Sequence, residues 1–283
     1  MHDITYQYGF TEEAGNFQNN DFNNGGVGHD AVIIENAAQG TNNAYFMCPP
    51  DGQPGQMAMF KWTRTSPGRW GALENSIPMH EYGHGVTNRM TGGSRNGQCL
   101  QKGEAGSMGE GWSDTFAVFL QRTESDNRKT DVTMGDYVIG DKKGIRTYPY
   151  STDLSVNPLR YSDLNWRTEP HLGGEVWATI LNELYWNLVD KIGFSSNWYD
   201  ALQIKGNIVA LQVVLGGVAI QPCNPTFLNA RDAIIQAEKN YYGGAYACDI
   251  WRAFAKRGMG MDAAYYSGRR GFENGFNIPY YCQ

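Results

Sequence analysis

The sequence predicts an α+β fold, with a β-rich N-terminal region followed by a mainly helical C-terminal region. Two observations lead to this prediction. Segments of strand length occur early in the chain: an apolar run at 31–34, a possible edge strand at 41–46 and a weakly alternating stretch at 57–62. From residue 176 onward, apolar residues recur at the three- and four-residue spacing of a helix that buries one face. We place the boundary between the two regions after residue 92, giving subdomains 1–92 and 93–283.

Local signals define the N-terminal elements. Residues 1–10 are expected to be the end of a helix closed by Gly9, and 14–30 a loop rich in Asn and Gly. We expect 31–34 to be a short buried strand and 41–46 an edge strand. A helix should run over 73–90, and because proline is tolerated only in a first turn, Pro78 predicts that its regular part starts near Ser76.

The C-terminal region is predicted to be a series of helices. A helix over 104–123 is followed by an irregular stretch, 124–167. Further helices are expected over 176–193, 204–217, 224–242 and 248–257. Asn224 and Pro225 are predicted as the N-cap and first residue of the third of these. The remaining residues form a Gly/Tyr-rich tail.

Composition limits the class of protein. The net charge is −6 and the isoelectric point about 5.4, which disfavours nucleic acid or an anionic membrane as a partner. No window approaches 18 consecutive apolar residues, so no membrane span is predicted. The hydrophobic content of 41% is enough for a sizeable core.

The helix predicted near Ser76 contains the pattern H-E-x-x-H, as His80, Glu81 and His84. Residues four apart lie on one face of a helix, so both imidazoles can reach a single ion. Glu81 would lie beside that ion, where it can hold an attacking water. The alternative is a surface helix in which the pattern is coincidental.

A third metal ligand is expected on another element, because catalytic zinc usually has three protein ligands and one open position. Glu110, in the helix predicted over 104–123, would complete a His₂Glu set. Asp114, one turn further on, could accept the outer N–H of a ligand histidine and so orient its ring. The alternative for this pair is a solvated helix face. The small neighbours Gly109, Gly111 and Ser113 favour close packing against another helix.

These motifs resemble the fungalysin family of secreted zinc metallopeptidases and, more distantly, thermolysin. The similarity is carried by H-E-Y-G-H-G-V-T-N-R-M-T-G-G at 80–93 and G-S-M-G-E-G-W-S-D at 106–114. Shorter matches extend it over nearly the whole chain: A-G-N-F-Q-N-N at 14–20, P-P-D-G-Q-P-G at 49–55, Q-P-C-N-P at 221–225 and A-F-A-K-R-G at 253–258. The resemblance implies a thermolysin-like zincin fold with a partial N-terminal β region.

The resemblance also implies roles for residues in the irregular stretch and just after it. His171, followed by G-G-E-V-W-A, matches a histidine that is not a ligand but hydrogen-bonds the oxyanion of the transition state. Arg146 matches an arginine that binds the substrate carbonyl beyond the scissile bond. A lone histidine in the core or at the surface, and an arginine in a surface ion pair, are the alternatives. The tyrosine that also contacts this oxyanion in thermolysin has no counterpart in the matching segment 99–102.

Asn43 and Ala44 resemble the segment that binds the substrate backbone as an added strand. An ordinary hairpin strand is the alternative. Pro170 replaces the valine usual before His171, and Gly83 replaces the threonine usual between the ligand histidines.

The five cysteines indicate an oxidising compartment, because their wide spacing suits disulfides and lacks C-x-x-C pairs. Four of them occur where fungalysins also have cysteine, and Cys48 does not, so we expect Cys48 to be unpaired. Family members have a signal, a propeptide and further β-structure before the matched region. The chain is therefore expected to be a fragment, a truncated gene model or a member without its first β region.

The sequence thus predicts a secreted, monomeric zinc endopeptidase that acts on proteins or peptides, with its own propeptide as inhibitor. Zinc would be held by His80, His84 and Glu110, with Glu81 as general base. The rival prediction is a zinc-binding but catalytically impaired fragment or binding module. A zinc hydrolase of non-peptide substrates is weaker, because a strand-like binding element suits an extended peptide. Relatives bind calcium, but the matching positions lack most of the needed carboxylates and we assign no calcium site.

Overall fold

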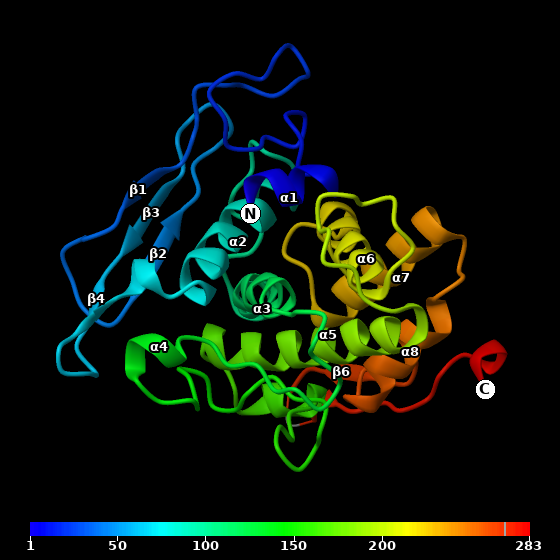
Figure 1. Ribbon diagram of the computed structural model, residues 1–283. Helices are drawn as coiled ribbons and strands as arrows, with labels where there is room; N and C mark the ends of the chain where they lie inside the picture. Colours follow the sequence, from blue (N-terminus) through cyan, green and yellow to red (C-terminus); the bar gives the residue numbers. More distant parts are fainter. Residues whose placement is uncertain (269) are drawn as a thin grey trace.

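The computed structural model describes residues 1–268 and 270–283 and has the predicted α+β architecture (Figure 1). The N-terminal part contains the short helix α1 (His2–Gln7) and a three-stranded sheet made of β1 (Ile33–Glu35), β2 (Ala44–Met47) and β3 (Gln56–Met59). The strand order is β1-β3-β2, with β1 parallel and β2 antiparallel to β3. One edge of β2 therefore has no partner strand among the described residues.

The apolar run at 57–62 forms two strands instead of one. After β3, the chain turns at Phe60, whose N–H donates to the carbonyl of Asn43 and whose carbonyl accepts from Gly71. A second pair of strands then follows, β4 (Lys61–Trp62) and β5 (Arg69–Trp70), and leads through a 3₁₀ turn at Gly71–Leu73 into α2 (Ser76–Met90).

The helical part is built around α3 (Gly103–Leu120), which packs between α2 and α5 (Pro170–Ile192) (Figure 1). Beyond α5 follow α6 (Gly206–Ile220), α7 (Phe227–Tyr242) and α8 (Ala247–Lys256). The stretch between α3 and α5 contains α4 (Asp136–Ile139) and a 3₁₀ turn at Tyr161–Asn165. The tail contains a hairpin that the sequence did not predict, β6 (Ala264–Tyr266) with β7 (Gly271–Glu273), and a last turn at Tyr280–Cys282.

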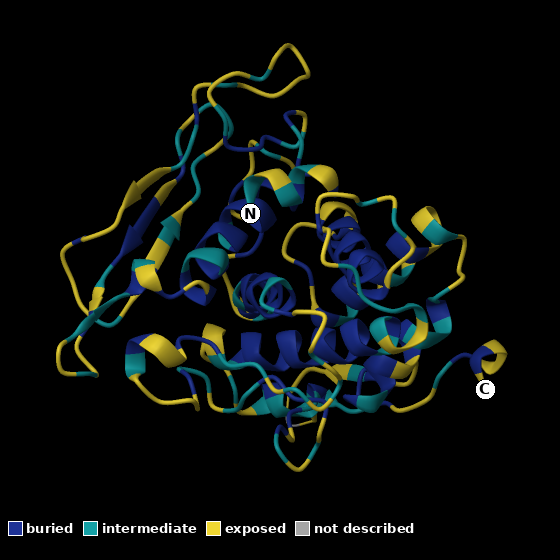
Figure 2. Ribbon diagram, in the orientation of Figure 1, coloured by how far each residue is buried: buried dark blue, intermediate teal, exposed yellow. Residues whose placement is uncertain are grey.

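The core lies where α3 and α5 cross, and both helices are buried over most of their length (Figure 2). The rings of Trp112 and Trp177 meet edge to face there, with centroids 4.9 Å apart. No helix of the described residues is both long and apolar enough to cross a bilayer.

Two further predictions about elements are wrong in detail. The run at 31–34 was expected to be buried, but Ile33 and Ile34 are 58% and 54% exposed because β1 is an edge strand. The third late helix starts at Phe227, not at Asn224. Its N-cap is Thr226, whose hydroxyl accepts from Asn229 N at 3.1 Å, while Asn224 has a left-handed φ of 54° outside the helix.

Two disulfides, Cys99–Cys223 and Cys248–Cys282, join segments far apart in the sequence. Cys48 is free, as predicted. The first disulfide links the segment before α3 to the segment before α7, and the second ties the tail to α8. The division of the chain after residue 92 stays a prediction.

Candidate active site

Helix α2 presents both motif histidines on the face that it turns toward α3. Its first residue is Ser76, so Pro78 lies in the first turn, where proline is tolerated. Gly83 lies between the two histidines, directly against Ser113 of α3. A Cβ built there would be 2.9 Å from Ser113 Cα on α3, so a side chain would push the helices apart. Glycine lowers the helix propensity at this position by about 1 kcal/mol relative to alanine. In return, it lets α2 pack closely on α3.

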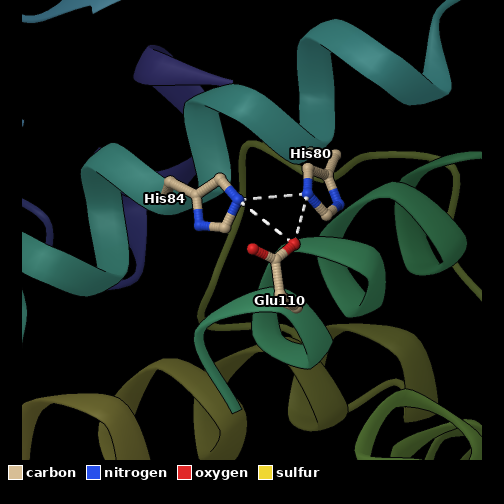
Figure 3. Close-up of side chains that lie close together, drawn as sticks. All are labelled: His80, His84 and Glu110. Carbon is tan, nitrogen blue, oxygen red and sulfur yellow. Dashed lines mark hydrogen bonds and ion pairs between the residues drawn. The ribbon is translucent and has the colours of Figure 1, made fainter. Parts of the chain in front are cut away.

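His80 and His84 on α2 and Glu110 on α3 point at one another (Figure 3). Nε2 of His80 lies 3.1 Å from Nε2 of His84 and 3.1 Å from Oε2 of Glu110, and the third separation, His84 Nε2 to Glu110 Oε2, is 3.5 Å. Within residues 1–268 and 270–283, this is the one group of three or more metal-binding side chains whose ligand atoms lie within 4.8 Å of one another.

These separations fit a tetrahedral metal site. Ligands at zinc's usual bond lengths of 2.0–2.1 Å are separated by tetrahedral edges of about 3.3 Å. The donor set of two imidazole nitrogens and one carboxylate oxygen also suits zinc. His80 and Glu81 are buried, whereas Glu110 and His84 are partly exposed, so the site opens on one side.

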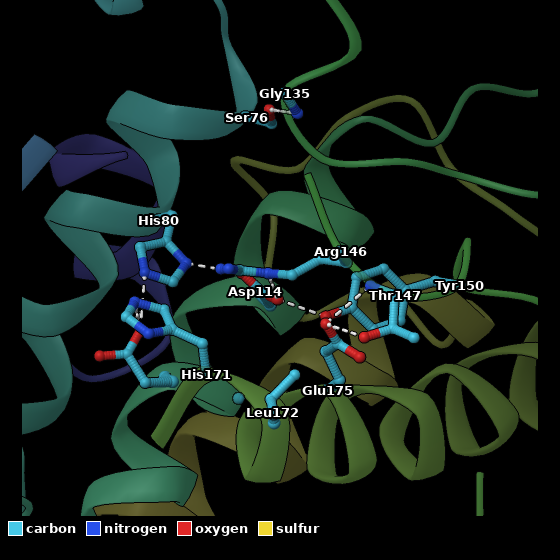
Figure 4. Close-up of polar contacts among 12 residues, drawn as sticks. Ser76, His80, Asp114, Gly135, Arg146, Thr147, Tyr150, His171, Leu172 and Glu175 are labelled. Carbon is cyan, nitrogen blue, oxygen red and sulfur yellow. Dashed lines mark hydrogen bonds and ion pairs between the residues drawn. The ribbon is translucent and has the colours of Figure 1, made fainter. Parts of the chain in front are cut away.

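Asp114 is the buried centre of the contacts that orient His80 (Figure 4). Its Oδ1 lies 2.6 Å from Nδ1 of His80, which leaves Nε2 of that ring to face Glu110. Arg146 donates to both carboxylate oxygens, from Nε and Nη2, each at 2.7 Å. The hydroxyl of buried Tyr150 also donates to Asp114.

This arrangement favours positive charge between the two helices. Burial lowers the pKa of the His80 imidazole, but Asp114 and Glu110 outweigh burial and raise it to about 10. Burial raises the pKa of the Asp114 carboxyl, yet Arg146 and His80 hold it well below its usual range. Glu110 is likewise held ionised by His84 and His80 against the effect of burial. A cation between these groups would meet ionised carboxylates.

His171 reaches the site from the first turn of α5. Pro170 is the first residue of that helix, so the local backbone is regular helix, earlier than the predicted start at residue 176. Nε2 of His171 lies 3.4 Å from Oε2 of Glu110, and its ring is 48% exposed. Nδ1 lies 2.6 Å from Oε1 of Glu169, whose other carboxylate oxygen accepts from Leu172 N at 3.0 Å and caps the helix.

The cleft has two adjoining hollows, of ≈ 640 and ≈ 340 Å³, that share Asn43, Ala44, His80, Glu81 and His171. Ala44 begins β2, so the unpaired edge of that strand borders the cleft. Arg146 lines the larger hollow together with apolar Ile77, Met134, Ile139 and Ile145. All nine residues singled out from the sequence therefore lie in or directly behind one cleft.

Three supporting residues were missed. Glu169 holds His171, Tyr150 contacts Asp114, and Glu175 accepts from Thr147 N at 2.8 Å and from Arg167 at 2.8 Å, which fixes the loop that carries Arg146. Glu169 had a usable signal, because a carboxylate two residues before a candidate catalytic histidine can orient its ring. The other two contacts depend on the path of the irregular stretch, which no local pattern revealed.

A family model of the fungalysin metallopeptidases (M36) matches residues 1–263. The chain belongs to this family. Among curated fungalysin-like relatives, an extracellular metalloproteinase of Aspergillus flavus is 48% identical over 95% of this chain and 43% of its own length. An extracellular metalloproteinase of Pyricularia oryzae is also 48% identical, over 97% of this chain and 44% of its own. This fungalysin chain thus spans less than half the length of these relatives.

The fold of this fungalysin is shared with a solved structure, the precursor of protealysin, a metalloproteinase from Serratia proteamaculans. The TM-score is 0.54 at 13% sequence identity, covering 91% of this chain and 74% of the other. This likeness supports the thermolysin-like zincin fold. Membership of a metallopeptidase family implies a metal, and the His80, His84 and Glu110 cluster is the group of described residues that could hold it.

Proposed function

We propose that this chain carries the active site of a secreted zinc endopeptidase that hydrolyses peptide bonds. The observation that carries the proposal is the convergence of His80, His84 and Glu110 beside Glu81, in a cleft bordered by an unpaired strand edge. The names of the relatives, which are extracellular metalloproteinases, support the same activity and location. We expect a monomer.

We propose zinc as the metal, with His80, His84 and Glu110 as its ligands and Asp114 holding the His80 ring. When bound, zinc would act as a Lewis acid that lowers the pKa of a bound water and polarises the scissile carbonyl. Asp114 accepts from Nδ1 of His80, so the nitrogen that would hold the metal is Nε2, after loss of the proton that Glu110 and Asp114 favour on the ring.

Glu81 is proposed to move the proton. It follows His80 directly on α2, and it lines both hollows of the cleft. In this position it takes a proton from the attacking water and delivers it to the leaving amine nitrogen. A general base of this kind contributes about 10²- to 10⁴-fold to the rate.

His171 and Arg146 are proposed to act on substrate oxygens. The half-exposed ring of His171, held by Glu169, can donate from Nε2 to the carbonyl oxygen as negative charge develops on that oxygen. Arg146 uses Nε and Nη2 on Asp114, and no partner of its Nη1 is found among the described residues. That nitrogen can bind the substrate carbonyl beyond the scissile bond.

Asn43 and Ala44 are proposed to bind the substrate backbone along the free edge of β2, so that the peptide adds a strand to the sheet. This mode suits proteins and peptides better than compact substrates. We also propose that a propeptide in the full-length protein occupies this cleft before activation. A solved structural neighbour is itself a precursor form.

Casein hydrolysis by the purified, zinc-loaded protein tests the proposal. Glu81→Gln should lower the rate by at least about 10²-fold and leave the bound metal unchanged, because Glu81 is no ligand. A chelator should abolish the rate, and zinc should restore it. A folded, zinc-loaded protein that cleaves neither casein nor short peptides would instead favour a binding module. The retained ligands and Glu81 argue against that alternative.

A further inference from the structure

The wall of the cleft that faces β2 contains a polar side chain with no role in the proposed mechanism. We propose that Gln101 binds the substrate backbone there, with its Oε1 accepting a peptide N–H from a residue before the scissile bond. This inference rests on the proposed endopeptidase function and adds a substrate-positioning residue to it.

Gln101 lies on the side of the metal ligands away from Arg146. Both hollows contain His80, Glu81 and His171, but Arg146 lines only the larger one. The smaller one continues past His84 to Asn88 and Gln101. If Arg146 binds the carbonyl beyond the cut, the smaller hollow takes the residues before it.

The orientation of the Gln101 amide is fixed by its neighbours. Nε2 donates to Oδ1 of Asn88 at 3.3 Å and to the carbonyl of Gly97 at 3.2 Å. The amide of Asn88 is fixed in turn, because its Nδ2 donates to the carbonyl of His84 at 2.8 Å. The backbone carbonyls of Gly97 and His84 can only accept. Reversing the amide of Gln101 or of Asn88 would therefore bring two acceptor oxygens together. Oε1 of Gln101 is therefore the atom left for a ligand.

The backbone under Gln101 is held firmly. Cys99, two residues earlier, is joined to Cys223, and its carbonyl accepts from Asn224 N at 3.1 Å. Gly106 and Gly109 let this segment pack closely against α3. A Cβ at Gly106 would be 3.2 Å from the carbonyl oxygen of Gln101, and one at Gly109 would be 3.2 Å from that of Leu100. A rigid support of this kind reduces the entropy lost when a substrate binds.

An extended peptide needs such an acceptor. A peptide that pairs with β2 directs alternate N–H and C=O groups toward the strand and the others to the opposite side. Closing the cleft around the peptide would leave those outward groups without water, and each unpaired group costs free energy. Gln101 supplies an acceptor on that side.

The same hydrogen bonds prevent Gln101 from stabilising the oxyanion. Its two amide hydrogens are both used within the protein, so it has no donor for the developing negative charge. Loss of Gln101 should therefore weaken peptide binding and raise KM, while kcat changes less than about two-fold.

A double-mutant cycle with backbone esters tests the proposal. The background is zinc-loaded Glu81→Gln protein, which should bind an N-acetylated octapeptide without cutting it. Each peptide N–H before the scissile bond is replaced in turn by an ester oxygen, and Kd is measured by calorimetry. One ester should weaken binding about 5- to 10-fold when Gln101 is present. With Gln101→Met, a side chain of similar length without an amide, the same ester should have less than about a two-fold effect.

Gln236→Met is the matched control, because Gln236 is an exposed glutamine whose Nε2 likewise donates to an Asn side chain, on α7. It should keep the full ester effect. Esters at N–H groups that pair with β2 should weaken binding equally in both backgrounds. If no ester loses its effect in Gln101→Met, the role of Gln101 is overturned even if the wild-type protein cleaves peptides. Peptide binding with the expected coupling, but no cleavage by the wild-type protein, would contradict the proposed function alone. A protein that binds no octapeptide at all would contradict both.

Discussion

The ring of His171 is held by a single carboxylate, Glu169, that also caps α5. This double use makes the histidine's position depend on the first turn of the helix. Substitutions of the two residues should therefore lower kcat to different extents. His171 faces the cleft, whereas Glu169 acts only by holding His171.

His171→Ala should lower kcat by about 10²- to 10³-fold, because a donor to the developing charge is lost. Glu169→Gln keeps the length of the side chain and one acceptor, so the loss should be smaller, about 10-fold. Steady-state kinetics on a short peptide measure both. If Glu169→Gln reduced kcat as much as His171→Ala, the carboxylate would have a direct role that the contacts do not indicate.

The thiol of Cys48 should be poorly reactive although it is unpaired. Burial raises its pKa to about 11, with Arg89 acting in the opposite direction. Only the thiolate reacts, and an ordinary cysteine has a pKa near 8.5, so alkylation at mildly alkaline pH should be about 100-fold slower in the folded protein than in denaturant. The rate should still rise with pH up to about 11. Fast labelling of native protein at neutral pH would contradict this environment.

At the residue scale, spacing alone predicted the His80, Glu81 and His84 group, because a four-residue repeat fixes a shared helix face. His171, Arg146, Asn43 and Ala44 could be named only from the family resemblance. The structure brings them into one cleft, and their roles stay proposals. Tyr150 and Glu175 could not be predicted, because their contacts arise from a long irregular segment folding back on α3 and α5.

The crossing of α3 and α5 places Glu110 opposite His171. Two glycines make this close approach: a Cβ at Gly174 would be 2.7 Å from Glu110 Cβ, and one at Gly111 would be 2.6 Å from Trp177 Cβ. Of the small residues predicted to favour helix packing, Gly111 lies against α5 and Ser113 against α2, whereas Gly109 lies against Leu100 in the segment before α3.

Gly174→Ala should therefore destabilise the protein by about 1–3 kcal/mol, the usual cost of overpacking a tight interface. The new methyl group also meets the side chain of a proposed zinc ligand, so zinc affinity should fall. Denaturant unfolding measures the first effect, and chelator competition the second. An unchanged unfolding midpoint would show that α3 and α5 leave room for a methyl group at Gly174.

The predicted start of a helix was correct where a single residue type restricts it. Pro78 restricts the start of α2, and the helix begins at Ser76 as expected. The prediction failed where two signals competed: Asn224-Pro225 suggests a helix start, but Thr226 and Asn229 form a capping box two residues later. The burial of 31–34 was also overestimated, because an apolar run does not reveal whether its strand lies at a sheet edge.

The whole molecule is held together by links between distant segments. The Cys99–Cys223 disulfide has a sequence separation of 124 and Cys248–Cys282 one of 34. In the loop-entropy model the longer loop stabilises the fold by about 1 kcal/mol more than the shorter one. Replacing Cys99 and Cys223 by serine should thus lower the free energy of unfolding more than replacing Cys248 and Cys282. Equal losses from the two pairs in denaturant titrations would contradict this ranking.

At this scale the α+β class followed from the order of strand-like and helical patterns, and the thermolysin-like architecture from the motifs. The disulfide pairing did not, because five cysteines allow several pairings until the chain path is known. The C-terminal hairpin was also missed, because its strands have three residues each.

The most direct test of the account is the zinc content of the purified protein and of its His84→Ala variant, measured by mass spectrometry of the metal after dialysis. We predict about one zinc per folded wild-type chain and a near-complete loss in His84→Ala, because two remaining ligands hold zinc poorly. Asn88→Ala, one turn further along α2 and outside the proposed ligand set, should keep its metal. Zinc that stays bound in folded His84→Ala protein, or a folded wild-type chain that takes up none, would contradict the proposed site.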